Sequence, residues 1–420
     1  MMTGKERVQT VLSHCEADRI ALDFGATPVT GIHVKKIAEF RRHYGLEDRP
    51  VKVAEPFQML GEVDDELANI WNVDVIGVGG RSDMFGHLQE DFVEARMPWG
   101  QTVLLPESFK MKEKKENIYV FPQGDTNCSP TAVMPKGGYF FDAIERTPTT
   151  EMDTELNIED NLEEFALMTD ADMLYWNEVL TKARATGKAV IANIGGTGIG
   201  DIALVPGLNL KNPKGIRAIA DWYISTVTRT DFLLELFDRQ LDIAIQNLEK
   251  VNRIAGDCID ILYVCGTDLG TQDGQFCSAE QLSALHGQAY RKINGWVHRN
   301  TGWKTFKHCC GAITPLLETF IDCGFDIINP VQINAAGMDP QFLKETYGNR
   351  ISFWGGGVDT QRVLQLGTPQ QVKNQVRQLC EIFSAGGGFV FNTVHNLQAN
   401  VPVENAIALM DAICELRNKN

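Results

Sequence analysis

The stretch that decides the fold is KTFKHCCGAITPLLETFIDCGFDIINPVQ, residues 304–332. Its first part (304–310) is typical of a short strand, its middle (313–323) of a helix, and its end (325–332) of a second strand with mostly apolar side chains. Strands of this kind are usually covered on both faces by helices, as in α/β proteins with a parallel sheet. The stretch therefore predicts one strand–helix–strand unit of such a sheet.

The rest of the chain repeats this alternation. Helical patterns are expected over 3–14, 31–44, 57–71, 157–187, 214–255 (interrupted near Thr230), 278–300, 313–323, 339–348, 369–385 and 402–418. Buried-type strands are expected at 20–25, 73–80, 188–196, 259–267, 304–310, 325–332, 351–358 and 387–396. Eight such strands favour a (β/α)8 TIM barrel over an open doubly wound sheet, and we expect one barrel domain over residues 1–420.

Residues 81–150 have a different character. They contain short alternating segments, a charged run (KMKEKKE) and turn signals such as PQGD and MPKGG. We interpret them as a β-rich insertion after the second strand of the barrel, and as a candidate lid.

The composition narrows the class of protein. With 44% hydrophobic and 22% charged residues the chain is an ordinary globular protein, and its net charge of −16 argues against nucleic-acid binding. No apolar run reaches the length of about 18–20 residues that a membrane helix needs. The N-terminal segment is too polar for a signal peptide, and the ten cysteines include no C-x-x-C pair, so we expect a cytoplasmic protein with free thiols.

Two metal-ligand residue types, His308 and Cys310, are two positions apart on the strand at 304–310. Alternate strand residues point to the same face, so these two side chains project together and Cys309 points the other way. An imidazole and a thiolate on one face are half of a zinc site. The alternative is a buried, hydrogen-bonded histidine beside a small apolar cysteine.

A barrel carries its active site at the C-terminal ends of its strands, and the eighth strand ends in His395. Side chains from the fifth and eighth strands can meet across this mouth. His308, Cys310 and His395 would then form a three-ligand site with one open position, as in catalytic zinc centres. Alternatively, His395 contacts the substrate or packs in the core.

The same rule selects the other candidates. Asp268 and Asp359 follow the fourth and seventh strands and could act as general acid or base, or as loop-capping carboxylates. Polar residues at the remaining strand ends are candidates for substrate binding: Thr197, Asn329, Gln332 and Gln398.

Several motifs together resemble the uroporphyrinogen decarboxylase-like superfamily. They are ERVQTVLSH and ADRIALDFG near the start, and then, in order, HCCG, FDIINPVQ, GMDP, LKETYG, FWGGGVDTQ, LGTP and VPVEN. The resemblance extends over nearly the whole chain and implies a (β/α)8 barrel.

Two branches of this superfamily must be separated. The decarboxylases have an arginine-rich N-terminal motif, whereas the first strand here leads into LDFGATPVTG without an arginine cluster. The H-x-C at His308 and Cys310 resembles instead the zinc-dependent, cobamide-linked methyltransferases. In those enzymes the third ligand, on the eighth strand, is usually a cysteine; matching VPVEN to their C-terminal segment places His395 at that position.

The resemblance implies a zinc-dependent transfer of a methyl group between a small substrate and the corrinoid (cobalamin) of a separate protein. A methyl ether, such as a methoxylated aromatic compound, is preferred to a thiol as substrate because His395 makes the zinc harder. A metal-free lyase and a non-catalytic corrinoid-binding barrel are the alternatives. Both a monomer and a homodimer are compatible with the resemblance.

Overall fold

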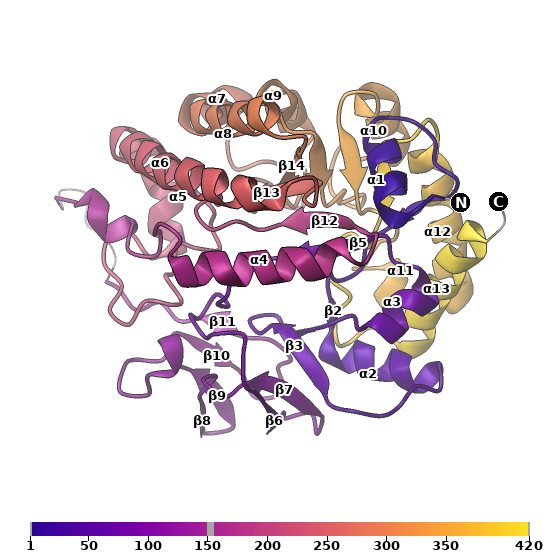
Figure 1. Cartoon of the computed structure of the whole chain (residues 1–420), viewed down its shortest axis with the longest axis horizontal. Coiled ribbons are helices and arrows are strands. Elements are labelled where there is room, and N and C mark those ends of the chain that lie inside the picture. Colours follow the sequence, from indigo (N-terminus) through magenta and orange to yellow (C-terminus); the bar gives the residue numbers. More distant parts are fainter. Residues whose placement is uncertain (1, 149–154, 419–420) are drawn as a thin grey trace.

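The computed structural model describes residues 2–148 and 155–418, and its centre is an eight-stranded parallel sheet (Figure 1). Its hydrogen-bonding order is β1-β17-β16-β15-β14-β13-β12-β5. The strands are β1 (Ala21–Leu22), β5 (Val75–Val78), β12 (Ala189–Ala192), β13 (Ile261–Cys265), β14 (Lys304–His308), β15 (Ile327–Asn329), β16 (Ser352–Trp354) and β17 (Phe389–Phe391). Each lies within a range predicted from the sequence, and the (β/α)8 barrel is confirmed.

The first and last strands of this order, β1 and β5, meet at a seam closed by Asp74. The Asp74 amide donates to the Leu22 carbonyl (2.9 Å), and the Leu22 amide donates to the Asp74 carboxylate (3.0 Å). The same buried carboxylate accepts from Arg7 (2.5 Å) and Arg417 (2.6 Å). Both ends of the chain are thereby attached to the seam of the barrel.

Helices surround the sheet, although the prediction of a helix over 157–187 is wrong for its first part, because the helix begins only at Asp170, where the side chain of Thr169 caps it. The helices are α4 (Asp170–Arg184), α5 (Ile219–Thr228), α6 (Thr230–Ala255), α7 (Ala279–Leu285), α8 (Gly287–Asn300), α9 (Leu317–Asp322), α10 (Pro340–Tyr347), α11 (Val363–Leu366), α12 (Pro369–Ser384) and α13 (Val403–Arg417). The predicted interruption near Thr230 is the boundary between α5 and α6. Within residues 2–148 and 155–418, no helix has both the length and the apolar character needed to cross a lipid bilayer.

Helix α1 (Gly4–Leu12) closes one end of the barrel. Its residues hydrogen-bond to the positions just before three strands: Lys5 to Gly187, Gln9 to Asp260, and Val11 to Gly388. Its apolar face packs on the side chains inside the barrel. Because α1 occupies the N-terminal ends of the strands, the open mouth is at the opposite end.

Two further sheets lie beside the barrel, one five-stranded (β2-β4-β3-β7-β6) and one four-stranded (β11-β10-β9-β8). Their strands are β2 (Ile32–His33), β3 (Val51–Glu55), β4 (Leu60–Gly61), β6 (Phe92–Arg96), β7 (Thr102–Pro106), β8 (Met111–Lys114), β9 (Asn117–Val120), β10 (Ala132–Met134) and β11 (Asp142–Ala143). Strands β6 to β11 follow β5, where the insertion is expected. Strands β2 to β4 come from the segment between β1 and β5, which also carries α2 (Val34–His43).

The prediction of a helix over 57–71 is wrong for the first half of this range, which contains β4. The Glu55 carboxylate accepts hydrogen bonds from the amides of Phe57 and Gln58, which turns the chain into β4. The helix α3 (Asp65–Trp71) begins only after Asp64, whose side chain caps the amide of Leu67.

The N-terminus of α2 provides a prediction about pH. The buried His33 ring accepts a hydrogen bond from the Lys35 amide (3.1 Å) and lies 2.9 Å from the Tyr139 carbonyl, and burial lowers the pKa of His33 to about 4. Between pH 6.5 and about 4, the His33 side chain is protonated in the unfolded chain but stays neutral in the folded chain. The contribution of this group to stability is therefore lost as the pH falls from 6.5 toward 4.

We expect this loss to reach about 2 kcal/mol between pH 7 and pH 5. In His33→Asn the amide oxygen can still cap α2 but does not titrate, so the free energy of unfolding should fall less over this interval than in the wild type. Urea unfolding at the two pH values measures the difference. Equal losses in the two proteins would contradict the assignment.

Candidate metal centre

Three possible metal ligands converge at the mouth of the barrel. His308 ends β14, Cys310 lies two residues further, and His395 lies in the loop after β17. Their ligand atoms all lie within 4.8 Å of one another, and Cys310 Sγ is 3.4 Å from His308 Nε2. The two imidazole rings meet edge to face, with centroids 5.4 Å apart.

The orientation of His308 is set by Asn329 at the end of β15. His308 Nδ1 lies 2.6 Å from Asn329 Oδ1, and the Asn329 amide group donates in turn to the Trp354 carbonyl (2.9 Å). Since an amide oxygen can only accept, the proton of the imidazole is on Nδ1. The lone pair of Nε2 therefore points toward Cys310 and is free for a metal ion.

Burial determines the protonation of the cluster. It lowers the pKa of His395 to about 4, with a further contribution from the neighbouring His308, so that His395 is neutral at pH 7. It also lowers the pKa of His308. The pKa of the Cys310 thiol is raised well above its ordinary value, by burial first and by the nearby Asp268 second. A bound cation would compensate for both effects on the thiol.

The donor set suits a tetrahedral ion such as Zn²⁺. With bonds of about 2.0–2.3 Å, such an ion separates its ligand atoms by roughly 3.3–3.7 Å, and the Cys310–His308 separation of 3.4 Å falls in this range. Two neutral imidazoles and one thiolate leave the fourth position open. A thiolate disfavours magnesium and calcium, which prefer oxygen ligands.

Asp268 lies at the edge of this cluster. One carboxylate oxygen accepts from the Cys310 amide (2.7 Å) and is 3.6 Å from His308 Nε2, while 39% of its side chain remains exposed. Because the pKa of His308 is lowered, this contact is not an ion pair at neutral pH. The carboxylate is thus available to a molecule entering the mouth.

Lys307, which sequence reasoning missed, lies on the opposite face of β14. It is fully buried, and its ammonium donates to the carbonyls of Thr267 (2.8 Å) and His308 (2.6 Å). It thereby joins the residue before Asp268 to the first metal ligand. A charged residue inside a strand that otherwise reads as buried is the signal that could have identified it.

Three of the residues assigned to substrate binding have their polar atoms engaged within the protein. Both amide atoms of Asn329 are used as described above. Gln332 accepts from the Gly311 amide (2.8 Å) and donates to Gln272 (3.0 Å), and the Thr197 hydroxyl faces the carbonyls of Ile194 and Tyr263. These contacts support the loops at the mouth.

The remaining two candidates are Asp359 and Gln398. The Asp359 carboxylate accepts from the amides of Gln361 (2.9 Å) and Arg362 (3.0 Å), which are the contacts of a loop-capping group rather than of an acid or base at the cluster. The side chain of Gln398 is half-buried, and its backbone carbonyl accepts a hydrogen bond from the Val401 amide (3.3 Å).

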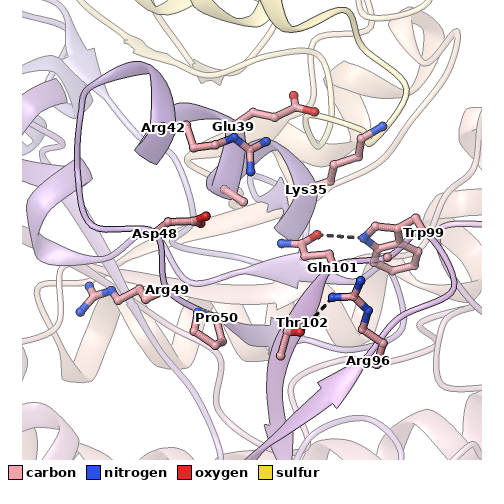
Figure 2. Close-up of a pocket in the computed structure, with 12 residues that line it drawn as sticks. Lys35, Glu39, Arg42, Asp48, Arg49, Pro50, Arg96, Trp99, Gln101 and Thr102 are labelled. Atoms are coloured by element: carbon pink, nitrogen blue, oxygen red, sulfur yellow. Dashed lines mark hydrogen bonds between the residues drawn. The ribbon is translucent and has the colours of Figure 1, made fainter.

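A surface hollow of about 440 Å³ lies elsewhere, between α2 and the β6–β7 hairpin (Figure 2). Basic side chains and one aromatic ring line it, among them Lys35, Arg42, Arg96 and Trp99. None of the three clustered ligands belongs to its lining.

The comparisons with known proteins agree with this fold. The profile of the uroporphyrinogen decarboxylase (URO-D) family matches residues 214–416. A solved structure, a methyltransferase from Methanosarcina mazei, is similar over 99% of both chains, with 14% identity and a TM-score of 0.54. A GH113 beta-1,4-mannanase matches with 12% identity over 59% of this chain and 80% of its own, but its TM-score of 0.29 carries no argument. Among proteins with curated functions, none matches this chain in sequence.

The cluster predicts the outcome of metal analysis. We expect protein loaded with zinc and then dialysed to retain about one equivalent, because three suitable ligands and an open position are present. A His308→Ala, Cys310→Ser double variant should retain none. Elemental analysis of both proteins measures this.

Cys309→Ser is the matched control for this experiment. Cys309 is adjacent in sequence but points away from the mouth, where its sulfur accepts from the Leu269 amide (3.2 Å), so zinc should remain. Equal zinc contents in the wild type and the double variant would contradict the assignment of the ligands.

Asn329 gives a second prediction. Asn329→Ala removes the acceptor that fixes the ring of His308, and we expect metal affinity to fall by about 10–100-fold. Asn329→Asp keeps an acceptor for His308 but loses the donor to the Trp354 carbonyl, so its affinity should lie between those of the wild type and Asn329→Ala. Competition with a chelating dye measures the affinity, and thermal unfolding of the metal-free proteins tests for general destabilisation. An unchanged affinity in Asn329→Ala would rule out the positioning role.

Proposed function

We propose that the chain is a zinc-dependent methyltransferase of the uroporphyrinogen decarboxylase-like superfamily, which moves a methyl group between a small substrate and the corrinoid of a partner protein; the match of the URO-D family profile to residues 214–416 and the shared fold support this. The observation that carries this proposal is the convergence of His308, Cys310 and His395 with one position left open. A decarboxylation without a metal gives no reason for such a donor set.

His308, Cys310 and His395 would hold the metal through Nε2, Sγ and an imidazole nitrogen. When bound, zinc supplies Lewis acidity toward the oxygen or sulfur of the substrate. Asn329 keeps the Nε2 lone pair of His308 directed into the site, and Lys307 holds the carbonyl of the same residue from behind. The chain thus supplies ligands that are already oriented before any substrate enters.

Asp268 is positioned to transfer a proton to or from a substrate at the cluster. When a methyl ether donates its methyl group, the carbon–oxygen bond breaks and the oxygen that is left behind must take up one proton. The partly exposed Asp268 carboxylate, 3.6 Å from His308 Nε2, can relay that proton or orient the substrate. We therefore assign it the role of acid, base or orienting residue.

His395 favours the ether as substrate. Related methyltransferases usually have a thiolate at this position, and His395 supplies a neutral imidazole instead. The bound metal would therefore carry more net positive charge. A harder, more electrophilic ion suits an oxygen better than a thiol sulfur. We therefore prefer a methyl ether, such as a methoxylated aromatic compound, as the donor and the corrinoid as the acceptor.

The name of the matching family favours a second candidate, a lyase that acts on a tetrapyrrole or an aromatic acid. The loop after β1, LDFGATPVTG, has no arginine to bind substrate carboxylates. We rank this candidate below the methyltransferase for that reason.

The test uses zinc-loaded protein, free reduced cobalamin and a panel of methoxylated aromatic compounds, with methylcobalamin formation followed by absorbance. We expect transfer in the wild type and in Cys309→Ser, and none in the His308→Ala, Cys310→Ser variant. Asp268→Asn should retain zinc but be slower by at least about tenfold. Carbon dioxide release from a carboxylated substrate, with no methyl transfer in either direction, would favour the lyase.

A further inference from the structure

Helix α5 exposes aliphatic side chains and buries polar ones, which is the reverse of what a surface helix normally does. Its inward side carries Asp221, Trp222 and Ser225, which are all buried. Its outward side carries Ile224 and Val227, which are 51% and 59% exposed. A surface helix normally buries its aliphatic side chains and exposes the polar ones, so this face is expected to be covered by another molecule.

The exposed apolar side chains of α5, with the half-buried Tyr223 between them, form one continuous face. At 100° per residue, they occupy an arc of roughly 140° along the helix. We call this face the α5 stripe; it consists of Ile219, Ala220, Tyr223, Ile224 and Val227. Phe276, which is 52% exposed, extends it, because its ring lies 4.9 Å from that of Tyr223.

The stripe reaches the rim of the metal centre. The Tyr223 hydroxyl donates to the carbonyl of Asp268 (2.9 Å), and the carboxylate of the same aspartate lies beside His308. Helix α5 also lies at the end of the molecule away from both termini (Figure 1), whereas α1 closes the other end of the barrel. A molecule seated on the stripe would therefore border the open mouth.

We propose that the α5 stripe, together with Phe276, is the docking surface for the protein that carries the corrinoid. This inference rests on the proposed function. A cofactor held by a second protein must approach a substrate bound at the cluster, so its carrier has to cover the rim. The stripe provides an apolar surface at that rim, and Tyr223, which belongs to the stripe, contacts Asp268 directly.

Its size fits this occupant better than a second copy of the chain. A ten-residue helix is about 15 Å long, so the stripe covers a small fraction of the roughly 800 Å² per partner that a stable interface buries. A carrier must leave after each transfer. A small apolar contact allows such exchange, whereas a permanent dimer needs a larger one.

The experiment uses an Ile224→Asp, Val227→Asp double variant, whose exposed positions leave the fold and the cluster intact. Leu366→Asp is the matched control, since Leu366 is 77% exposed on α11 and lies outside the stripe. Transfer is measured with free cobalamin and with the small corrinoid-binding proteins of the same organism, each purified and loaded with its cofactor. Light scattering gives the oligomeric state.

We expect at least a tenfold rise in the carrier concentration that gives half-maximal rate in the double variant, with unchanged rates on free cobalamin and an unchanged control. If the double variant uses every carrier as the wild type does, docking on the stripe is wrong while the proposed function stands. If a wild-type dimer becomes a monomer in the variant, a second copy covers the stripe instead. An absence of transfer to or from free cobalamin in the wild type would overturn both proposals.

Discussion

The structure depends on the closure of the parallel sheet, and that closure depends on Asp74. Its carboxylate and amide connect β1 to β5, and the guanidinium groups of Arg7 and Arg417 neutralise it from helices at the two ends of the chain. All three side chains are buried, and the loss of Asp74 would leave the buried Arg417 without its carboxylate partner, at a cost of about 3–5 kcal/mol. Only in a closed barrel do β14 and the loop after β17 face the same mouth.

Within that mouth, the two faces of β14 have separate roles. The inner face carries His308, which Asn329 orients, and Asn329 is itself held by Trp354. The indole of Trp354 donates to the buried Asp23 (2.9 Å), and burial raises the pKa of this carboxyl to about 6. The outer face carries Lys307. The imidazole of His308, the first candidate ligand, is therefore held by a chain of hydrogen bonds through Asn329 and Trp354 to Asp23.

This donor set, rather than overall similarity to other barrels, is the feature of the molecule that points to a function. A shared barrel at 14% identity is evidence of fold, and barrels of one fold host many chemistries. The family profile matches residues 214–416, just under half of the chain, and this match does not by itself select a reaction. Two imidazoles and a thiol whose ligand atoms lie within 4.8 Å of one another are what favours the methyltransferase in our proposal. The apolar stripe on α5 then relates the same mouth to a second protein.

The sequence by itself determined the eight barrel strands and the shared face of His308 and Cys310. Both follow from local periodicity, because the side chains of a strand alternate wherever the strand lies. It also indicated that His395 could join them, but only the tertiary structure placed its ring 5.4 Å from that of His308. The roles of Asn329, Lys307 and Asp359, and the turn at Glu55 that shortens the expected helix, likewise required the structure. Each depends on partners that are distant in sequence or on the geometry of one loop, and no residue pattern encodes these contacts.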